Sequence, residues 1–451
     1  MALLAALPAL AALAVFGIIR TPDSPGYVAY AEQLRAGLPS GAALLAEGPS
    51  PVSLFRTPGY PALLAALQWA LPAGWTWAAV LLQIAAQAGV AALAHRTALR
   101  LGLPRRAALG AALLPAIGFA VVVQIAILTD ALYAALATAA ALLLARGRPA
   151  AAAGAGLLLA AATLLREATP FLAFGYLPLA WLAMSRDAAR RALAAALVLA
   201  GPWAAVLGLT AWNDARIGRP VLTTSRQTVM VQAVLPLLKR HLPVYDGEDA
   251  FDRIARATVG GGEYGAIDEL HRRLVSEAHM TAPDIADAAT RRYLRAWRRF
   301  PLAMLVATIQ NFRHEFLALP FQPVDTVGAL IVYAGWPRPV FDRLNLLWAA
   351  LRHGSVLAGL EIAFDVTTRL AGTCIAVLAI ATPWVLRRRP DRTARVLLGF
   401  WLVCAGYFAV YLPVHIEPRY LVPVVPLACL LAAACLVTER VRQGREGGDL
   451  A

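Results

Sequence analysis

Apolar runs long enough to cross a lipid bilayer recur along the whole chain. Each has about 17 to 22 residues, and a helix of that length, rising roughly 1.5 Å per residue, spans the roughly 30 Å hydrocarbon layer. The runs predict ten spans: 2–20, 75–95, 107–127, 129–145, 150–166, 170–184, 191–212, 368–386, 394–413 and 419–438. With 60% hydrophobic and 15% charged residues, the composition argues against a water-soluble fold. We expect an all-α polytopic membrane protein with about 10 to 12 transmembrane helices.

Arginines gather in every second short connection, which predicts the orientation of the spans. The basic connections are 96–106, 146–148, 186–191, 387–395 and 440–445. The positive-inside rule places them in the cytoplasm, together with both termini. Two long segments, 21–74 and 213–367, then lie outside, and loops of that length are usually functional.

The first long segment predicts two helices at the membrane surface. Ser24 and Pro25 form a helix start, and Gly37 ends that helix. Residues 62–71 are apolar but too short to span, so we expect a second interfacial helix after the turn at 58–61.

The second long segment predicts helices near 246–258, 263–279 and 283–300. The third has an apolar side and many arginines on its other positions, which favours an amphipathic helix on an anionic membrane surface. Its apolar side comprises Ile285, Ala289, Tyr293, Trp297 and Phe300. For residues 302–319 we favour an interfacial helix, with two further spans within 302–350 as the alternative. The expected domains are 1–212, 213–367 and 368–451.

The formal charge of +14 does not point to nucleic acid, because the basic residues lie mostly between the apolar runs. We expect membrane lipids as neighbours and no nucleic-acid partner. All four cysteines fall inside apolar runs, so neither a disulfide framework nor a CxxC metal site is predicted.

Ionisable residues at the outer ends of separate spans form the candidate site. They are Asp23, Arg56, Asp130, Arg166, Glu167, His415, Glu417 and Arg419. Such residues are costly beside hydrocarbon, so their convergence on one leaflet indicates function. A carboxylate whose pKa is raised by desolvation could act as a base, and arginine matches phosphate oxygens.

Each residue also has a structural alternative. Asp23 and Asp130 stand at helix starts, where a carboxylate complements the helix dipole. Arg166 could pair with Glu167, and Arg419 could be an interfacial anchor. His415 and Glu417 are two residues apart, but no HExxH-type spacing supports a metal site.

Five short motifs resemble bacterial glycosyltransferases of the GT-C superfamily. They are Asp23-Ser24-Pro25-Gly26-Tyr27, Arg56-Thr57-Pro58-Gly59-Tyr60-Pro61, Leu128-Thr129-Asp130, Leu164-Leu165-Arg166-Glu167, and Glu417-Pro418-Arg419-Tyr420-Leu421-Val422-Pro423. The pattern is similar to protein O-mannosyltransferases, lipid A aminoarabinose transferases and rhizobial lipopolysaccharide galacturonosyltransferases. It covers residues 15–185 and the last span.

This resemblance implies an inner-membrane enzyme with its active site on the periplasmic side. The donor would be a polyprenyl-phosphate-linked monosaccharide, the acceptor a lipid, glycan or protein, and the reaction an inverting single displacement. Asp23 would be the base and Asp130 would orient the acceptor, while Arg56, Arg166 and Arg419 would contact the donor phosphate. Further substrate contacts would come from Tyr27, Tyr60, His415, Glu417 and Tyr420. A divalent metal ion stays open as a cofactor, because Ser24 stands where the family often has a second acidic residue.

Two other functions fit the same sequence features. A polymerase or ligase of surface polysaccharide would use a lipid diphosphate donor. A transporter or lipid flippase would also combine spanning helices with a few charges, but no internal repeat is found and no ionisable residue lies near the middle of a predicted span.

Overall fold

The computed structural model describes residues 1–46, 48, 50–184, 187–316, 323–335, 352, 354, 356–387 and 391–448. These residues form helices joined by turns and short connections, with no β-strand among them. An isolated bridge joins Ile19 to Ala126. The expectation of an all-helical chain is therefore confirmed for this part of the protein.

Four helices in the described part are long and apolar enough to span a membrane. They are α6 (Trp75–Arg100), α12 (Ala188–Ile217), the Arg369–Leu386 part of α20 (Val356–Leu386), and α21 (Arg392–Tyr411). Shorter apolar helices are α1 (Ala2–Phe16), α9 (Asp130–Leu144), α10 (Pro149–Leu165), α11 (Thr169–Ala183), the start of α17 (Pro301–Phe316) and the Val425–Val437 part of α22 (Val425–Gly448). The set fits a helical membrane protein. The number of spans stays a prediction, because helices of 15 to 17 residues reach only about 22 to 26 Å.

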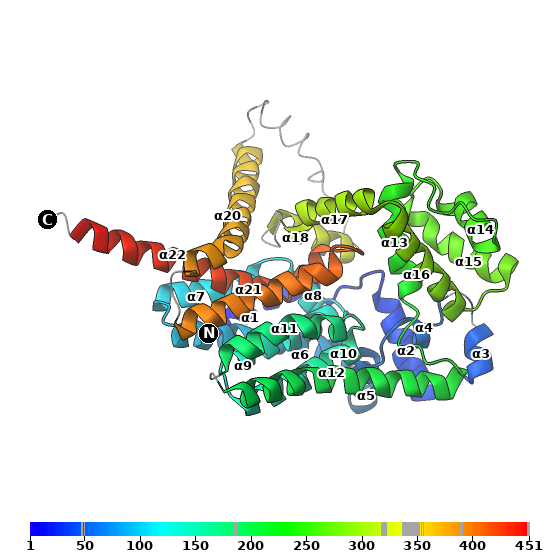
Figure 1. The fold of residues 1–451 in the computed structure, drawn as a ribbon, viewed down its shortest axis with the longest axis horizontal. Helices are drawn as coiled ribbons and strands as arrows, with labels where there is room; N and C mark the ends of the chain where they lie inside the picture. The colour runs from blue at the N-terminus through cyan, green and yellow to red at the C-terminus, as the bar shows by residue number, and fades with distance from the viewer. Residues whose placement is uncertain are drawn as a thin grey trace.

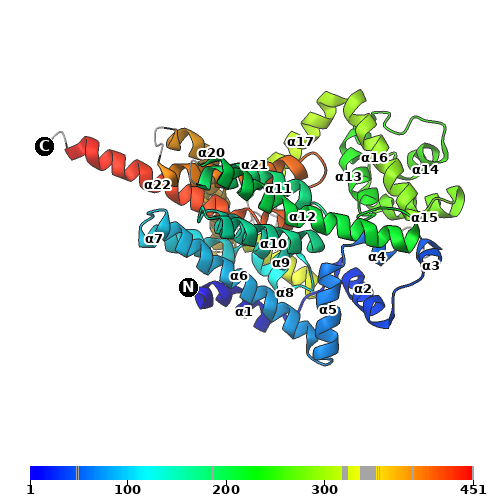
Figure 2. The ribbon, with the colours of Figure 1, turned by 60° about the horizontal axis from the view of Figure 1, so that its bottom comes forward.

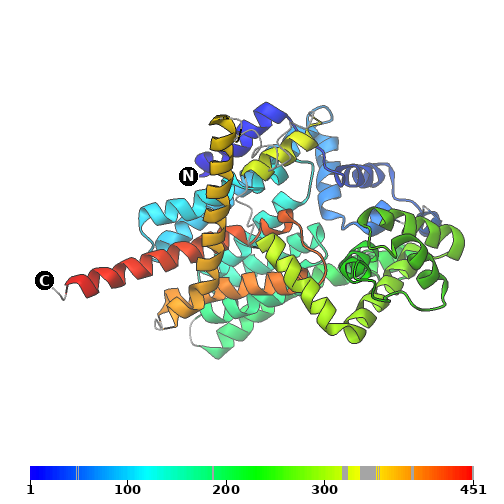
Figure 3. The same ribbon diagram turned by 90° about the horizontal axis from the view of Figure 1, so that it is seen from above.

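Most of these helices lie side by side in one bundle. Helix α10 packs against α9 and α12, α11 packs against α12 and α21, and α6 packs against α1 and α9 (Figure 1). Helix α20 crosses the direction of α21 and α22 and contacts both (Figure 3).

Two glycines allow the backbones of α11 and α21 to approach each other closely. A Cβ atom built on Gly406 would lie 2.8 Å from the Cα atom of Gly175, and one built on Gly175 would lie 3.3 Å from the Cα atom of Gly406. Small residues let helix backbones approach in this way inside a membrane. Any larger side chain at either position would push α21 away from α11.

The prediction of one continuous span over 107–127 is wrong. The segment folds as α7 (Arg105–Leu113), a 3₁₀ turn η1 (Leu114–Ile117) and α8 (Ala120–Ile125). Pro115 stands in the first turn of η1 and Gly118 ends it in an extended conformation. Proline lacks the backbone N–H that an α-helix interior needs, which accounts for the break.

The two long polar segments meet at the same end of the bundle. The first contains α2 (Ser24–Ala36), α3 (Gly41–Ala46), α4 (Val52–Phe55) and α5 (Gly59–Ala70). It is tied to the second by hydrogen bonds from Thr224 N to Leu54 O at 2.9 Å and from Gln227 Nε2 to Ser50 Oγ at 2.7 Å. Figures 1 and 2 show α2, α3, α4 and residues 226–299 at the end opposite the chain termini.

The second segment folds into a four-helix unit with its own core. It consists of α13 (Arg226–Leu238), α14 (Ala250–Val259), α15 (Ile267–Ala278) and α16 (Ala282–Arg299), with a short turn η2 (Tyr264–Ala266) before α15. Helix α16 begins at a capping box in which Thr281 and Asp284 bond to each other's backbone N–H groups.

The prediction that the apolar side of 283–300 lies on the membrane is wrong. Ile285 and Ala289 are buried against α13 in the core of the unit, and Trp297 packs on the same core. An apolar helix face buries against whatever apolar surface is nearest, and here that surface is protein.

Helix α17 carries the exposed apolar face instead. Leu302, Leu305, Val306 and Ile309 are spaced along one side of the helix and are exposed. Such a face suits either an interfacial helix or a span, so the interfacial helix expected for residues 302–319 stays a prediction. Of the alternative pair of spans, α18 (Pro323–Tyr333) is described, while 317–322 and 336–350 lie outside the described residues.

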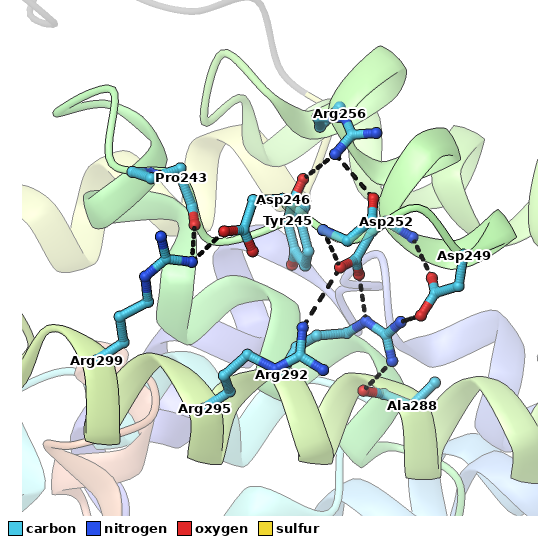
Figure 4. A network of polar contacts seen from close by, with 11 residues as sticks. Pro243, Tyr245, Asp246, Asp249, Asp252, Arg256, Ala288, Arg292, Arg295 and Arg299 are labelled. Atoms are coloured by element: carbon cyan, nitrogen blue, oxygen red, sulfur yellow. Dashed lines mark hydrogen bonds and ion pairs between the residues drawn. The ribbon is translucent and has the colours of Figure 1, made fainter.

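A buried ion-pair network holds the four-helix unit together (Figure 4). Arg292 Nε donates to Asp252 Oδ1 at 2.5 Å, and its Nη2 donates to Asp249 Oδ2 at 2.5 Å. Asp252 is fully buried and also accepts from Gly247 N at 2.9 Å. Because both charges leave water, the network is stable only while each partner is present.

Candidate functional site

Asp23 stands where the bundle meets the first long segment. It is the residue before α2, and Ser24 Oγ accepts from Thr21 N at 2.9 Å, which fixes the turn. The Asp23 carboxylate makes no bond to the helix it precedes. Instead, Oδ1 accepts from Arg56 Nη2 at 2.7 Å and Oδ2 accepts from Arg419 Nη1. The three residues that were expected to converge therefore lie in direct contact.

Aromatic rings position Arg56. Its guanidinium lies 4.2 Å from the centre of the Tyr27 ring, which meets Tyr60 edge to face at 5.2 Å. Tyr60 donates from its hydroxyl to Gln83 Oε1 at 2.7 Å. Tyr27 and Tyr60 were expected to contact substrate, but both are buried, so in this structure they support Arg56 from behind.

Glu417 and His415 extend the cluster from the other side. Arg419, in the short turn η4 (Pro418–Leu421), has its Nε atom 2.6 Å from Glu417 Oε2. His415 Nε2 lies 3.1 Å from Glu417 Oε1. The side chains of Asp23, Arg56, Glu417 and Arg419 are each between 17% and 30% exposed, so the cluster opens to water.

A second ion pair lies deeper in the bundle. Asp130, the first residue of α9, accepts from Arg166 Nη2, which follows the last residue of α10. The pairing of Arg166 with Glu167, one of the expected alternatives, is not what the structure has: Glu167 Oε1 accepts from Ser225 Oγ at 2.5 Å.

Tyr420 joins the two ion pairs. The centre of its ring lies 4.4 Å from the Arg166 guanidinium carbon and 5.4 Å from that of Arg419. Around Arg166, the Oδ2 atom of Asp130 and the hydroxyls of Tyr133, Tyr407 and Tyr411 are buried without a hydrogen-bond partner among the described residues. Such orphaned oxygens mark a place where water or a bound polar molecule is favoured.

The electrostatics of Asp23 correct one expectation. Burial alone raises the pKa of this carboxyl, but the charges of Arg419 and Arg56 outweigh burial and hold the pKa well below its usual range. Burial also raises the pKa of Glu417, and its bond to His415 and the charge of Arg419 reverse that effect and lower it. Asp23 is therefore a fully ionised carboxylate in this state, and the predicted upward shift of its pKa is wrong.

The cluster is not arranged as a metal centre. Among the residues that the structure describes, no group of three or more histidine, cysteine, aspartate or glutamate side chains is placed to hold a metal ion. The carboxylates face arginines instead of one another. Arg56, Arg166 and Arg419 balance Asp23, Asp130 and Glu417, which gives a compact set of three positive and three negative groups.

Neither a protein-family model nor a curated protein matches the sequence. The case for function therefore rests on the geometry.

One residue of the site was missed by the sequence analysis. Tyr264 comes from η2 of the four-helix unit, and the centre of its ring lies 6.3 Å from that of His415. Tyr264 falls in the first turn of the helix predicted near 263–279 and was assigned no role, whereas the structure has a 3₁₀ turn there and begins α15 only at Ile267. The run Gly260-Gly261-Gly262, directly before Glu263 and Tyr264, is the local signal for a tight loop presenting an aromatic side chain.

Proposed function

We propose that this protein is a membrane glycosyltransferase that moves a monosaccharide from a polyprenyl-phosphate donor to an acceptor outside the cytoplasm. One observation carries the proposal: Asp23 lies between Arg56 and Arg419 at the water-facing end of an apolar bundle. A lipid-linked sugar phosphate has its tail in hydrocarbon and its head at this level. The acceptor would be a glycolipid, a polysaccharide or a protein.

The charges of the cluster suit this reaction. The donor is a phosphodiester with one negative charge, and the acceptor hydroxyl attacks the anomeric carbon. The bond from that carbon to the phosphate oxygen breaks, the oxygen keeps the electron pair, and the acceptor proton passes to Asp23. The phosphate gains one negative charge while Asp23 loses one, so the total charge beside Arg56 and Arg419 is unchanged.

The low pKa of Asp23 implies that donor binding must precede proton transfer. In the free protein two arginines stabilise the Asp23 carboxylate and make it a weak base. A donor phosphate that engages Arg56 and Arg419 would draw them from Asp23 and raise the pKa of this carboxyl. Asp23 would then become a useful base only when the donor is in place.

Asp130 and Arg166, which lie deeper in the bundle, would contribute to the same site. The free Oδ2 atom of Asp130 is an acceptor for a sugar hydroxyl, and Arg166 shares the Tyr420 ring with Arg419. An inverting outcome follows from a single displacement, in which the acceptor attacks opposite the phosphate. No step of this scheme requires a cofactor.

The site is proposed to face the periplasm across a bacterial inner membrane. Helices α2 to α4 and the four-helix unit lie at the end that holds Asp23, while the described residues of the arginine-rich connections lie at the opposite end, beside both termini (Figure 1). By the positive-inside rule, the arginine-rich end is cytoplasmic.

The second candidate function is transfer from a diphosphate carrier, as in a polysaccharide polymerase or ligase. It is favoured by the third arginine, since Arg166 is close enough to share Tyr420 with Arg419. A transporter or flippase is less favoured, because the cluster lies at one end of the bundle and transporters bind near the bilayer midplane.

The test is to incubate purified, reconstituted protein and an outer-leaflet lipid extract with labelled carriers. One arm uses polyprenyl-phosphate monosaccharides, the other a polyprenyl-diphosphate oligosaccharide. We expect label to leave the monophosphate carrier and appear on an acceptor, with release of polyprenyl phosphate. Use of the diphosphate carrier alone would support the second candidate, and movement of intact carrier between leaflets without bond cleavage would support the flippase.

A further inference from the structure

Tyr264 places an exposed aromatic ring over the charged cluster. The residue is 57% exposed and belongs to the four-helix unit, whereas the charged cluster lies at the end of the bundle. Its ring faces His415, whose ring lies 6.3 Å from Tyr420 at an angle of 87°. Three rings, one from the four-helix unit and two from the connection between α21 and α22, therefore line one side of the cluster formed by Asp23, Glu417 and Arg419.

The loop that carries Tyr264 is closely packed. Gln232 Nε2 donates to the Tyr264 hydroxyl at 2.6 Å. Gly262 has a φ of +76°, and a Cβ atom there would lie 2.5 Å from Lys239 Cγ and 2.9 Å from Leu235 O. The loop thus rests directly on the end of α13, which fixes the direction of the ring.

The surroundings keep Tyr264 neutral. Partial burial raises the pKa of its phenol, and the negative charge of Glu417 raises it further, while Arg419 acts in the opposite direction. A neutral phenol ring has one polar edge, here held by Gln232, and two apolar faces, and the exposure of the residue leaves part of this apolar surface open.

An open aromatic face beside a phosphate cradle suits a pyranose. The C–H bonds on one face of a sugar ring carry slight positive charge, and the face of an aromatic ring is negative. The donor sugar is joined directly to the phosphate, so it must lie within one sugar diameter of Arg56 and Arg419.

We infer that Tyr264 is the platform on which the donor monosaccharide stacks, and that it lets the protein distinguish a sugar-bearing carrier from the spent one. The inference rests on the proposed function, since it takes the donor phosphate to lie against Arg56 and Arg419. It assigns the four-helix unit a part in recognising the substrate. Tyr264 is a specificity residue here, with no role in proton transfer.

The experiment measures equilibrium binding of two probes to the full-length reconstituted protein. One probe is polyprenyl phosphate alone. The other is a panel of polyprenyl-phosphate monosaccharides that includes a neutral hexose, a hexuronic acid and an amino pentose. For the wild type we expect at least one panel member to bind roughly 2- to 10-fold more tightly than the bare carrier.

The substitution Tyr264→Ala should remove this preference and leave the dissociation constant of bare polyprenyl phosphate unchanged. Tyr264→Phe and Tyr264→Trp should keep it, because each retains an aromatic face. Leu294→Ala, at an exposed position on α16, is the matched control and should behave as wild type. Equal thermal unfolding of all variants excludes a folding effect.

Two results would overturn the inference, and they differ from failure of the proposed function. The inference alone fails if the wild type transfers sugar and Tyr264→Ala still binds the sugar-bearing carrier more tightly than the bare one. It also fails if Tyr264→Ala weakens the binding of both probes equally. If the wild type binds neither probe and transfers no sugar, the proposed function fails and this inference fails with it.

Discussion

Asp23 and Arg419 are separated by 396 positions in the chain and form an ion pair. One belongs to the first polar segment and the other to the turn before the last helix. Neither segment supplies a complete cluster, because Asp23 has Arg56 beside it but depends on Arg419 from the far end of the chain. The charged cluster thus exists only when the whole bundle has assembled.

Asp23→Asn should separate chemistry from binding. We expect kcat to fall by about 100-fold or more, since a positioned base contributes roughly that much. Donor binding should stay as tight or become tighter, because Arg56 and Arg419 lose the carboxylate that competes with phosphate. Radiolabelled transfer and equilibrium binding would give the two values.

Asp187→Asn is the matched control for that variant. Asp187 is half exposed, caps α12 at the other end of the bundle and should leave kcat unchanged. If Asp23→Asn loses donor affinity together with activity, Asp23 serves to hold the arginines in place and is not the base.

Arg419→Ala should weaken donor binding by roughly 10- to 100-fold, as expected for a hydrogen bond to a charged group. Arg419→Lys keeps the charge but loses the planar fork, so its loss should be smaller. The dissociation constant of a polyprenyl-phosphate sugar is the measurement. Arg190→Ala, exposed at the opposite end, is the control, and an unchanged constant in Arg419→Ala would remove Arg419 from the phosphate site.

The stability of the free protein should depend on pH through Asp23. Its folded pKa lies below the unfolded value of about 4, so the unfolded state binds the proton more readily. The contribution is then complete above about pH 4 and is lost as the pH falls towards the folded pKa. The free energies of unfolding of wild type and Asp23→Asn, measured by thermal unfolding, should differ by a constant amount from pH 8 to pH 5. The gap should narrow only below about pH 4, and a gap that closes between pH 7 and pH 5 would mean that the Asp23 pKa is not lowered.

The Asp252–Arg292 pair should be strongly coupled. Arg292→Met alone leaves the buried Asp252 carboxylate without its closest partner and should destabilise the four-helix unit by about 3 to 5 kcal/mol. Adding Asp252→Leu should recover much of that loss. Hydrogen exchange of α14 and α16 in the intact protein would measure the loss of stability in the single and the double variant. If the losses from the two substitutions simply add, the pair does not act as a unit.

The orientation of the bundle can be tested with single cysteines in a cysteine-free background. Glu248→Cys lies in the four-helix unit and Arg105→Cys at the opposite end, and both positions are exposed. A membrane-impermeant maleimide added to intact spheroplasts should label the first and spare the second. The reverse pattern would place the Asp23 cluster in the cytoplasm.

Two features could be predicted from the sequence: the apolar helices of a membrane protein, and the convergence of charged residues that lie far apart in the chain. Charged side chains at the ends of apolar runs are costly, so Asp23, Arg56 and Arg419 stood out against their surroundings. The start of α2 was located to within one residue by a local rule, the proline in its first turn, although the residue that precedes the helix is Asp23 and Ser24 is its first residue.

The predictions failed where the burial or the pKa of a residue depends on which other residues contact it. Periodicity showed that Ile285 and Ala289 share a face, but not whether protein or lipid covers it. Desolvation predicted a raised pKa for Asp23, whereas the direction depends on two arginines whose distances no sequence states. Pro115 and Gly118 are themselves signals of a helix break, but the span over 107–127 was predicted from the hydropathy of the whole run, which does not detect such a break.

The contact between Gly175 and Gly406 has a consequence for how such a chain can change over time. Helix α21 carries Tyr407 and Tyr411 and leads directly to His415 and Arg419. A mutation that adds one methyl group at this crossing would shift the end of α21 and the segment that carries His415 and Arg419, without altering any polar residue. Descendants of this sequence are therefore expected to keep both glycines or to replace them together with compensating neighbours.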